Sequence, residues 1–207
     1  MNAQLFSTKQ RILGAAEALF ARHGFAGASL RQVTAAANVN LAAVNYHFGS
    51  KENLINEVFR RRLDDLNAER LKALAEAQAK PDFGLNEALA AFVRPALAMS
   101  GDTHGGSAFV RVLARAYAEH NERLRKFLHD NYGHVLKEFA AVFSKLLPHL
   151  DKQELYWRLD IVSGALTYAM ADFGVIKRRT GVSEQQHRDL AAEHLIKFAA
   201  AGMRVES

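Results

Sequence analysis

The spacing of apolar residues constrains this 207-residue chain more than any other feature of its sequence. Apolar side chains recur at intervals of three and four residues almost everywhere, and no segment shows the alternation expected of a strand. Only three prolines interrupt the pattern. Because this interval places side chains on one face of an α-helix, the sequence predicts an all-α protein of about nine amphipathic helices.

Several classes of protein and site are excluded by composition. No apolar run of about 18 residues is present, so we expect no membrane-spanning helix. The N-terminal segment MNAQLFSTKQR lacks the basic and apolar regions of a secretory signal. The chain has no cysteine, and its nine histidines form no cluster at metal-ligand spacing. We therefore expect a cytoplasmic protein without metal, cofactor or membrane partner.

Helix start and stop signals are dense in the first quarter of the chain. A first helix is predicted over residues 8–23, where Gly24 suits the left-handed conformation of a helix stop. A second begins after Ser29, since S-L-R-Q is a capping-box pattern. Asn38 tolerates the left-handed conformation of a tight turn, and Asn40 can cap a third short helix. This order of elements is a helix-turn-helix layout.

The third predicted helix has the side chains of a DNA-reading helix. Apart from an apolar face at Val44 and Phe48, it carries small or polar residues, which fit a major groove about 12 Å wide. Charge supports the same interpretation, because residues 1–51 hold five basic side chains against Glu17 alone, a net +4 of the chain's +5. A basic head on a nearly neutral body is typical of a protein that binds a polyanion.

The remaining chain is predicted to form a larger helical body. A fourth helix starts at Ser50 and extends to about Lys80, before Pro81, which gives about 45 Å of helix and is long enough to join two bodies. We therefore predict a helix-turn-helix DNA-binding domain over residues 1–50 and an effector-binding and dimerisation domain over residues 51–207. The further predicted helices span residues 85–99, 108–118, 121–147 and 151–179, and a last helix follows Ser183, with a loop at 103–107.

Residues 10–55 resemble the DNA-binding head of the TetR family of transcriptional regulators. The resemblance rests on RILGAAEALFARHGFAGASLRQVTAAANVN and NYHFGSKENL, with the helices and turns in register. It implies a ligand-responsive repressor that binds a near-palindromic operator in double-stranded DNA as a homodimer. NLAAVNYHFGSK and KFAAAGMRVES also look like the fatty-acid-responsive, PsrA-like branch. That branch implies a small apolar effector, a long-chain fatty acid or its thioester with coenzyme A.

Some residues depart from the family's pattern. Asn38 stands where glycine is usual, but asparagine can adopt the same backbone conformation. Leu41, Ala43 and Asn45 replace the usual lysine or polar residue, threonine or serine, and aromatic residue. These three changes alter which bases are read, so no operator sequence can be taken from a distant relative.

We expect DNA contacts from the third helix and from the N-termini of the second and fourth helices. Tyr46, His47 and Lys51 can donate to phosphates, although Tyr46 and His47 can also simply end the third helix. Ser29 can act as a cap only or as a cap and a phosphate ligand. The predicted DNA-binding residues are Ser29, Arg31, Asn40, Leu41, Ala42, Asn45, Tyr46, His47 and Lys51.

Two further residue sets follow from the implied architecture. The candidate ligand-binding residues are Phe92, Met99, Phe109, Arg111, Leu113, Tyr117, Phe139, Phe143 and Tyr168. Each aromatic residue can equally be ordinary core, and Arg111 can equally be solvated or pair with an acid such as Glu119. The candidate dimer residues, on the last two helices, are Leu155, Leu159, Val162, Leu166, Leu190, His194 and Phe198.

The sequence also bears on two other classes of protein. An enzyme is not expected, because the sequence contains no G-x-S-x-G motif, and THGGS lacks the strand-to-helix setting of a phosphate-binding loop. A helical interaction module, or an architectural protein that binds DNA without sequence preference, remains an alternative.

Overall fold

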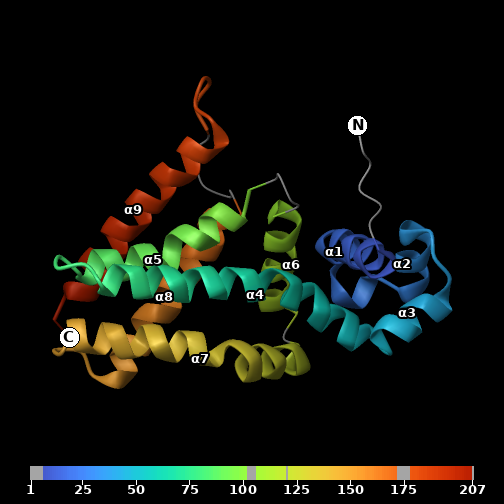
Figure 1. The fold of residues 1–207 in the computed structure, drawn as a ribbon, viewed down its shortest axis with the longest axis horizontal. Helices are drawn as coiled ribbons and strands as arrows, with labels where there is room; N and C mark the ends of the chain where they lie inside the picture. The colour runs from blue at the N-terminus through green and yellow to red at the C-terminus, as the bar shows by residue number, and fades with distance from the viewer. Residues whose placement is uncertain (1–6, 102–105, 120, 172–177, 207) are drawn as a thin grey trace. The chain divides into compact units, whose positions relative to one another are not determined.

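The protein's computed structural model describes residues 7–101, 106–119, 121–171 and 178–206. Every regular element in these ranges is a helix, which confirms the all-α prediction (Figure 1). The helices are α1 (Thr8–Gly27), α2 (Leu30–Ala37), α3 (Leu41–Phe48), α4 (Lys51–Gln78), α5 (Leu85–Met99), α6 (Gly106–Ala118), α7 (Glu122–Leu146), α8 (Lys152–Met170) and α9 (Glu184–Arg204). None of the described helices is both long and apolar enough to cross a membrane.

Local chemistry sets most of the observed helix ends. The predicted capping box at Ser29 is confirmed, and Asn38 is left-handed with φ 51°. Gly24 is also left-handed (φ 73°), but it kinks α1 rather than ending it, since the helix resumes through Gly27. Capping and turn residues therefore set most of the boundaries between the first three helices.

Two predicted segments differ from the structure or include residues outside the described ranges. The helix predicted over 151–179 is observed as α8 and ends at Met170, while residues 172–177 lie outside the described residues. In the loop predicted at 103–107, residues 103–105 are likewise outside the described ranges, and Gly106 and Ser107 already belong to α6.

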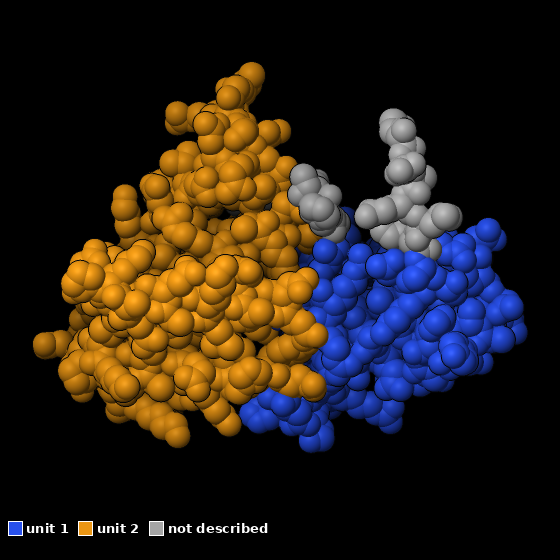
Figure 2. All heavy atoms as spheres, in the orientation of Figure 1, with its two compact units in different colours: residues 1–63, 108–130 blue, residues 64–107, 131–207 orange. Residues whose placement is uncertain are grey.

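The chain divides into two compact units (Figure 2). Unit 1 contains residues 1–63 and 108–130, and unit 2 contains residues 64–107 and 131–207. Three helices, α4, α6 and α7, contribute residues to both units. Residues 51–63 and 108–130, which the predicted boundary at residue 50 left in the second domain, therefore group with the head helices.

An aromatic cluster explains this grouping in unit 1. Phe20 and Phe25 of α1 lie 5.6 Å apart between ring centroids, and Phe25 lies 6.2 Å from Phe59 of α4. Phe59 in turn meets Phe109 of α6 edge to face at 5.6 Å. All four rings are buried, so α1, α4 and α6 share one continuous core.

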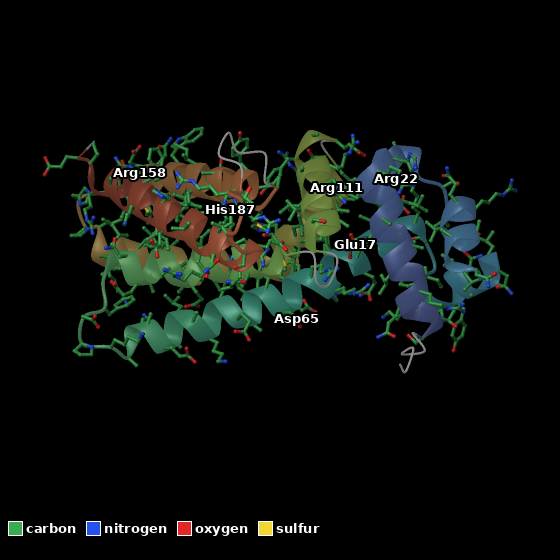
Figure 3. The ribbon with its side chains drawn as sticks, turned by 90° about the horizontal axis from the view of Figure 1, so that it is seen from above. Glu17, Arg22, Asp65, Arg111, Arg158 and His187 are labelled. Carbon is green, nitrogen blue, oxygen red and sulfur yellow. The ribbon has the colours of Figure 1, made fainter. Side chains whose placement is uncertain are left out.

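A buried ion pair joins α1 to α4 beside this cluster. The Nε and Nη2 atoms of Arg62 donate to the two carboxylate oxygens of Glu17 at 3.2 and 2.9 Å. Both side chains are largely buried, with 5% of Glu17 and 13% of Arg62 exposed. Figure 3 shows Glu17 on α1 within unit 1. The two parallel hydrogen bonds fix the orientation of the pair as well as its distance.

Unit 2 is built on the packing of α5, α8 and α9 (Figure 1). Phe92 of α5 meets Phe139 of α7 edge to face at 5.1 Å, and Phe143 extends the cluster. The Arg70 guanidinium lies 4.1 Å from the centre of the Phe92 ring. Arg158 of α8 donates to the carbonyl oxygens of Gly202, Met203 and Val205, and so ties the C-terminus of α9 to α8.

Arg62→Met should lower the free energy of unfolding by about 3–5 kcal/mol, because it leaves the buried Glu17 carboxylate without its partner. Urea denaturation followed by circular dichroism measures the change. Arg61→Met is the matched control: this neighbouring side chain is exposed, so its replacement should change stability by no more than about 0.5 kcal/mol. Equal effects of the two substitutions would contradict the role given to the ion pair.

Candidate nucleic-acid interface

The turn between α2 and α3 is closed by backbone hydrogen bonds. The Asn38 N–H donates to the carbonyl oxygens of Ala35 and Thr34, and the Val39 N–H donates to the Thr34 carbonyl at 3.0 Å. The Asn40 side-chain oxygen then accepts the Ala43 N–H at 2.9 Å and caps α3, as predicted. These bonds hold the two short helices at a fixed angle, which is the requirement of a helix-turn-helix.

The two faces of α3 differ sharply. Val44 and Phe48 are buried, as the sequence predicts, and anchor the helix on the core of unit 1. Tyr46, on the opposite face, is exposed by 86%, and Leu41, in the first turn of the helix, is exposed by 43%. Both of these large side chains are therefore accessible to a partner.

The exposed face of α3 brings together most of the predicted DNA-reading residues. Asn40, Leu41, Ala42, Asn45 and Tyr46 are exposed. An asparagine such as Asn45 can pair with the N6 and N7 atoms of adenine, and Leu41 and Ala42 can contact a thymine methyl group. The face is therefore suited to direct readout of bases in a major groove.

The end of α3 has an aromatic pair. The rings of Tyr46 and His47 meet edge to face with 5.1 Å between their centres, and His47 is half-buried. Gly49 then takes φ 72° and ends the helix, its N–H donating to the Asn45 carbonyl at 2.9 Å. Tyr46 is 86% exposed, so its hydroxyl is accessible from solvent.

The starts of α2 and α4 offer backbone N–H groups to an anion. The Ser29 hydroxyl accepts the Gln32 N–H at 3.2 Å and donates to the Gln32 side-chain oxygen, so Ser29 acts as a cap within its own chain. Arg31, in the first turn of α2, is exposed. Ser50 caps α4 by accepting the Asn53 N–H at 3.1 Å, and half-buried Lys51 is the first residue of that helix. Helix N-termini with a nearby cation are typical phosphate sites.

Not all basic residues of the head are available to DNA. The Lys9 ammonium lies 2.9 Å from the Glu57 carboxylate, which also pairs with Arg60. Burial opposes ionisation of Glu57, but the hydrogen bonds from Lys9 and Arg60 outweigh it and hold the pKa of Glu57 below its usual value. Lys9 is therefore partly neutralised, and its charge contributes less to the field of the head.

Three arginines that our predictions did not include line a hollow of about 490 Å³ in unit 1. Arg11 and Arg22 stand at its ends on α1, Arg61 comes from α4, and Gly14 and Ala18 form part of its floor. No acidic side chain lines it. The spacing of eleven residues between Arg11 and Arg22, three helical turns, is the sequence signal that places both on one face.

The predicted ligand-binding residues do not form one cluster. Phe109, Arg111, Leu113 and Tyr117 belong to unit 1, where Phe109 packs on Phe59. The other five belong to unit 2: Phe92, Phe139 and Phe143 are buried core, Tyr168 is exposed, and Met99 lines a hollow.

That hollow has a volume of about 700 Å³ and lies between α4, α5 and α9 in unit 2. Six alanines and two leucines are among the residues that line it. Its rim carries both signs of charge: Asp65, Glu69, Glu76, Glu87 and Asp189 against Lys80, Arg94 and Arg188. The sequence did not indicate this site, because its walls come from three helices far apart in the chain.

The predicted dimer residues also separate into two groups. Leu155, Leu159, Val162 and Leu166 are buried within unit 2, where α8 packs against α5 and α9. Leu190, His194 and Phe198 of α9 are exposed, with Phe198 exposed by 74%. The opposite face of α8 exposes Trp157, Ile161 and Tyr168, which recur at helical spacing. Helical spacing alone does not distinguish which of the two apolar faces of α8 is buried in the fold.

Comparison with known proteins decides the family. Residues 12–58 match the description "Bacterial regulatory proteins, tetR family", and residues 90–202, more than half of the chain, match "Tetracyclin repressor-like, C-terminal domain". The chain belongs to the TetR family. The predicted family is thereby confirmed, together with its arrangement of an N-terminal helix-turn-helix and a C-terminal helical domain.

Curated relatives of the chain are bacterial HTH-type transcriptional regulators. The chain is 44% identical over 70 residues to the transcriptional regulatory protein RaaS of Mycobacterium tuberculosis, which covers 34% of this chain and 30% of RaaS. It is 27% identical over 133 residues to the regulator BetI of Burkholderia thailandensis, covering 63% of this chain and 65% of BetI. The chain thus spans less than two thirds of the length of each. The names of these relatives are those of regulators and not of enzymes.

Solved structures share the fold over nearly the whole chain. The TetR family regulator PfmR of Thermus thermophilus superimposes with a TM-score of 0.64 at 19% identity, covering 92% of this chain and 95% of PfmR. A regulator of Saccharomonospora viridis in complex with choline superimposes with a TM-score of 0.59 at 19% identity, covering 93% and 95%. At these identities the likeness establishes the TetR fold alone.

Lys51→Ala should weaken binding to every duplex by a similar factor, because a phosphate contact carries no sequence information. The slope of log affinity against log salt should fall by about 0.9, the value for one phosphate. Fluorescence anisotropy at several salt concentrations measures both quantities.

Lys72→Ala is the control for this substitution. It removes the same charge from an exposed site on the same helix, about 31 Å along the helix axis from Lys51. An unchanged salt slope in Lys51→Ala, or an equal change in Lys72→Ala, would remove Lys51 from the interface.

Proposed function

We propose that this TetR family protein is a ligand-responsive transcriptional repressor that binds a near-palindromic operator as a homodimer. The observation that carries the proposal is the exposed face of α3, where Leu41, Asn45 and Tyr46 stand on a helix anchored by Val44 and Phe48. Apart from the buried pair, the helix carries small or polar residues and these exposed side chains, which suit a helix that lies in a major groove. The net positive charge of the head favours DNA as that partner.

We propose contacts of three kinds between the head and the duplex. Leu41, Ala42 and Asn45 face base edges, with Asn40 at the edge of the same surface. Tyr46, His47 and Lys51 contact the backbone at the junction of α3 and α4. Ser29 and Arg31 contact it at the start of α2. Because phosphate contacts position the protein and base contacts specify the sequence, only the first group sets operator preference.

The proposed dimer surface lies on α8 and α9. Trp157, Ile161 and Tyr168 of α8 are exposed at helical spacing, and Leu190, His194 and Phe198 of α9 form a second exposed stripe. A second copy of the chain that pairs these stripes would form a four-helix interface and remove both from water. Leu155, Leu159, Val162 and Leu166 support this surface from the interior of unit 2 rather than contacting the second copy.

Phe198→Asp should shift the protein from dimer to monomer, since it places a charge in the centre of the proposed apolar interface. Sedimentation equilibrium measures the dissociation constant, which should rise at least tenfold, because burial of a phenylalanine contributes about 1.5–3 kcal/mol. Ala75→Asp, at an exposed position of α4 outside both stripes, is the control. A variant that remains fully dimeric would place the interface elsewhere.

We propose the hollow between α4, α5 and α9 as one site for the small-molecule effector. Its lining includes Ala73, Ala77 and Ala98, against which an acyl chain can pack, and Arg94 and Arg188, which can bind a carboxylate or phosphate. This arrangement agrees with the fatty-acid hypothesis drawn from the sequence. The five acidic residues of the same rim favour a cation instead, the class to which choline in the Saccharomonospora viridis regulator belongs.

Titration of a protein–operator complex tests the function and the effector together. The operator is first selected from random duplexes, and it should bind about 10³-fold or more tightly than random DNA. Palmitate, palmitoyl-coenzyme A and choline are then added separately. We expect an acyl ligand to weaken operator binding by about 5–150-fold, the range of common allosteric couplings.

The outcomes separate the proposals. Failure to select any preferred duplex would favour an architectural protein that binds DNA without sequence preference. Release by choline but not by the acyl ligands would replace the fatty-acid hypothesis with a cation.

A further inference from the structure

Glu119, immediately after α6, reaches the kink in α1. One carboxylate oxygen accepts the Phe25 N–H at 3.1 Å, and the other accepts the N–H groups of Phe25 and Ala26 at 3.1 and 3.4 Å. The residues are 94 positions apart in sequence, yet all belong to unit 1. A side chain outside α1 therefore holds two backbone N–H groups of that helix.

The kink at Gly24 creates the N–H groups that Glu119 binds. Gly24 adopts φ 73° and ψ 174°, so the chain leaves the helix there and resumes it at Phe25. The N–H groups of Phe25 and Ala26 are then equivalent to those at the start of a new helical turn, which need acceptors from elsewhere. Because Glu119 is negatively charged, its hydrogen bonds to them are stronger than those of a neutral cap.

The contact requires glycine at position 24 for two reasons. The left-handed conformation disfavours any residue with a Cβ atom. In addition, a Cβ atom at this position would lie 2.2 Å from Oε1 of Glu119. Gly24 therefore permits both the kink in α1 and the close approach of the Glu119 carboxylate.

The bound segment leads directly into the proposed DNA surface. Only Gly27 and buried Ala28 separate Ala26 from Ser29, the cap of α2. Arg31, a proposed phosphate contact, lies in the first turn of α2. If the Glu119 carboxylate moves, then either the backbone of Gly27 and Ala28 changes conformation or the N-terminus of α2 moves with it.

Glu119 is not the only attachment of α6 within unit 1. Phe109 packs edge to face on Phe59 at 5.6 Å, and Nη2 of Arg115, one turn before Glu119, approaches the Arg22 carbonyl at 3.5 Å. The hydrophobic contact holds α6 near its start, while Glu119 holds the chain at its end. Since hydrogen bonds depend on direction more than apolar packing does, the Glu119 end is the more sensitive to rotation of α6.

We propose that Glu119 is a positioning residue for DNA binding: it holds the Gly24–Ala26 segment so that the N-terminus of α2 fits the phosphate backbone. Movement of α6 would withdraw the carboxylate and weaken the operator contact made by α2. This proposal rests on the proposed function, and it names the residue through which α6 acts on the head.

Two measurements on Glu119→Ala test the contact and its consequence. Hydrogen exchange followed by NMR should show faster exchange of the Phe25 and Ala26 amides. Affinity for the operator selected by the wild-type protein should fall at least about tenfold, the factor expected for loss of a hydrogen bond to a charged group. Glu119→Gln keeps one acceptor oxygen and should recover part of the loss.

Glu122→Ala is the matched control. Glu122 lies three residues further along the chain, its side chain is 80% exposed, and it pairs only with its neighbour Arg125 in the described ion pairs. The substitution removes the same charge from unit 1 without affecting α1, so operator affinity should stay within about twofold.

Double substitutions test whether Glu119 acts through α2. In an Arg31→Ala background, Glu119→Ala should cost less than in the wild type, because the contact it positions is already lost. In a Lys51→Ala background, Glu119→Ala should reduce operator affinity by the same factor as in the wild type, because the proposed Lys51 contact is made from α4 and does not depend on α2. If Glu119 had a purely structural role, Glu119→Ala would reduce operator affinity by the same factor in both backgrounds.

Several results would overturn the proposal. Unchanged exchange of the Phe25 and Ala26 amides would show that the contact is absent in solution. Faster amide exchange with unchanged operator affinity would show that Glu119 stabilises the fold but does not position α2 for DNA. The proposed function would be unaffected by that result. If the wild-type protein itself prefers no duplex, the proposed function fails, and the exchange data still report whether the contact exists.

Discussion

The attachment of α1 to α4 is the interaction on which the rest of the head depends. The bidentate pair of Glu17 and Arg62 sets the relative orientation of these helices, and the buried rings of Phe20, Phe25 and Phe59 fill the space beside it. The helices α2 and α3 are eight residues each and cannot fold alone. They acquire a fixed position only because α1 and α4 provide a rigid surface for Val33, Val44 and Phe48.

Short-range and long-range forces have separate roles in the candidate interface. Capping side chains and left-handed residues set the lengths of α2 and α3, and the core decides which face of α3 is exposed. Ion pairing with acidic side chains then determines which basic residues of the head remain available to a phosphate. Lys9 is engaged by Glu57, whereas Arg31 has no acidic partner within the described ranges and remains available to phosphate. The candidate interface therefore consists of side chains that the fold leaves exposed and unpaired within the described ranges.

The grouping of α6 with the head bears on how the proposed effector could act on the proposed DNA contacts. Phe109 joins the aromatic cluster of the head, and Glu119 binds backbone groups of α1. Helices α4, α6 and α7 each contribute to both units, so a change within the body has covalent routes to the head. An effector needs only a difference in affinity between two arrangements of these helices to bias DNA binding.

Sequence alone determined the features that depend on neighbouring residues. The caps at Ser29 and Asn40, the left-handed Asn38 and the buried pair Val44 and Phe48 follow from local hydrogen bonding and helical spacing, and the structure agrees with them. The family could be identified from the same stretch, because its turns and caps occur at fixed intervals.

Only the tertiary structure decided which apolar face of α8 is buried, that Phe109 belongs with the head, and that Glu119 meets Gly24. The periodicity of a helix shows that a face is apolar but not which other helix covers it. A contact across 94 residues depends on how several helices pack together, and no local pattern in the sequence carries that information.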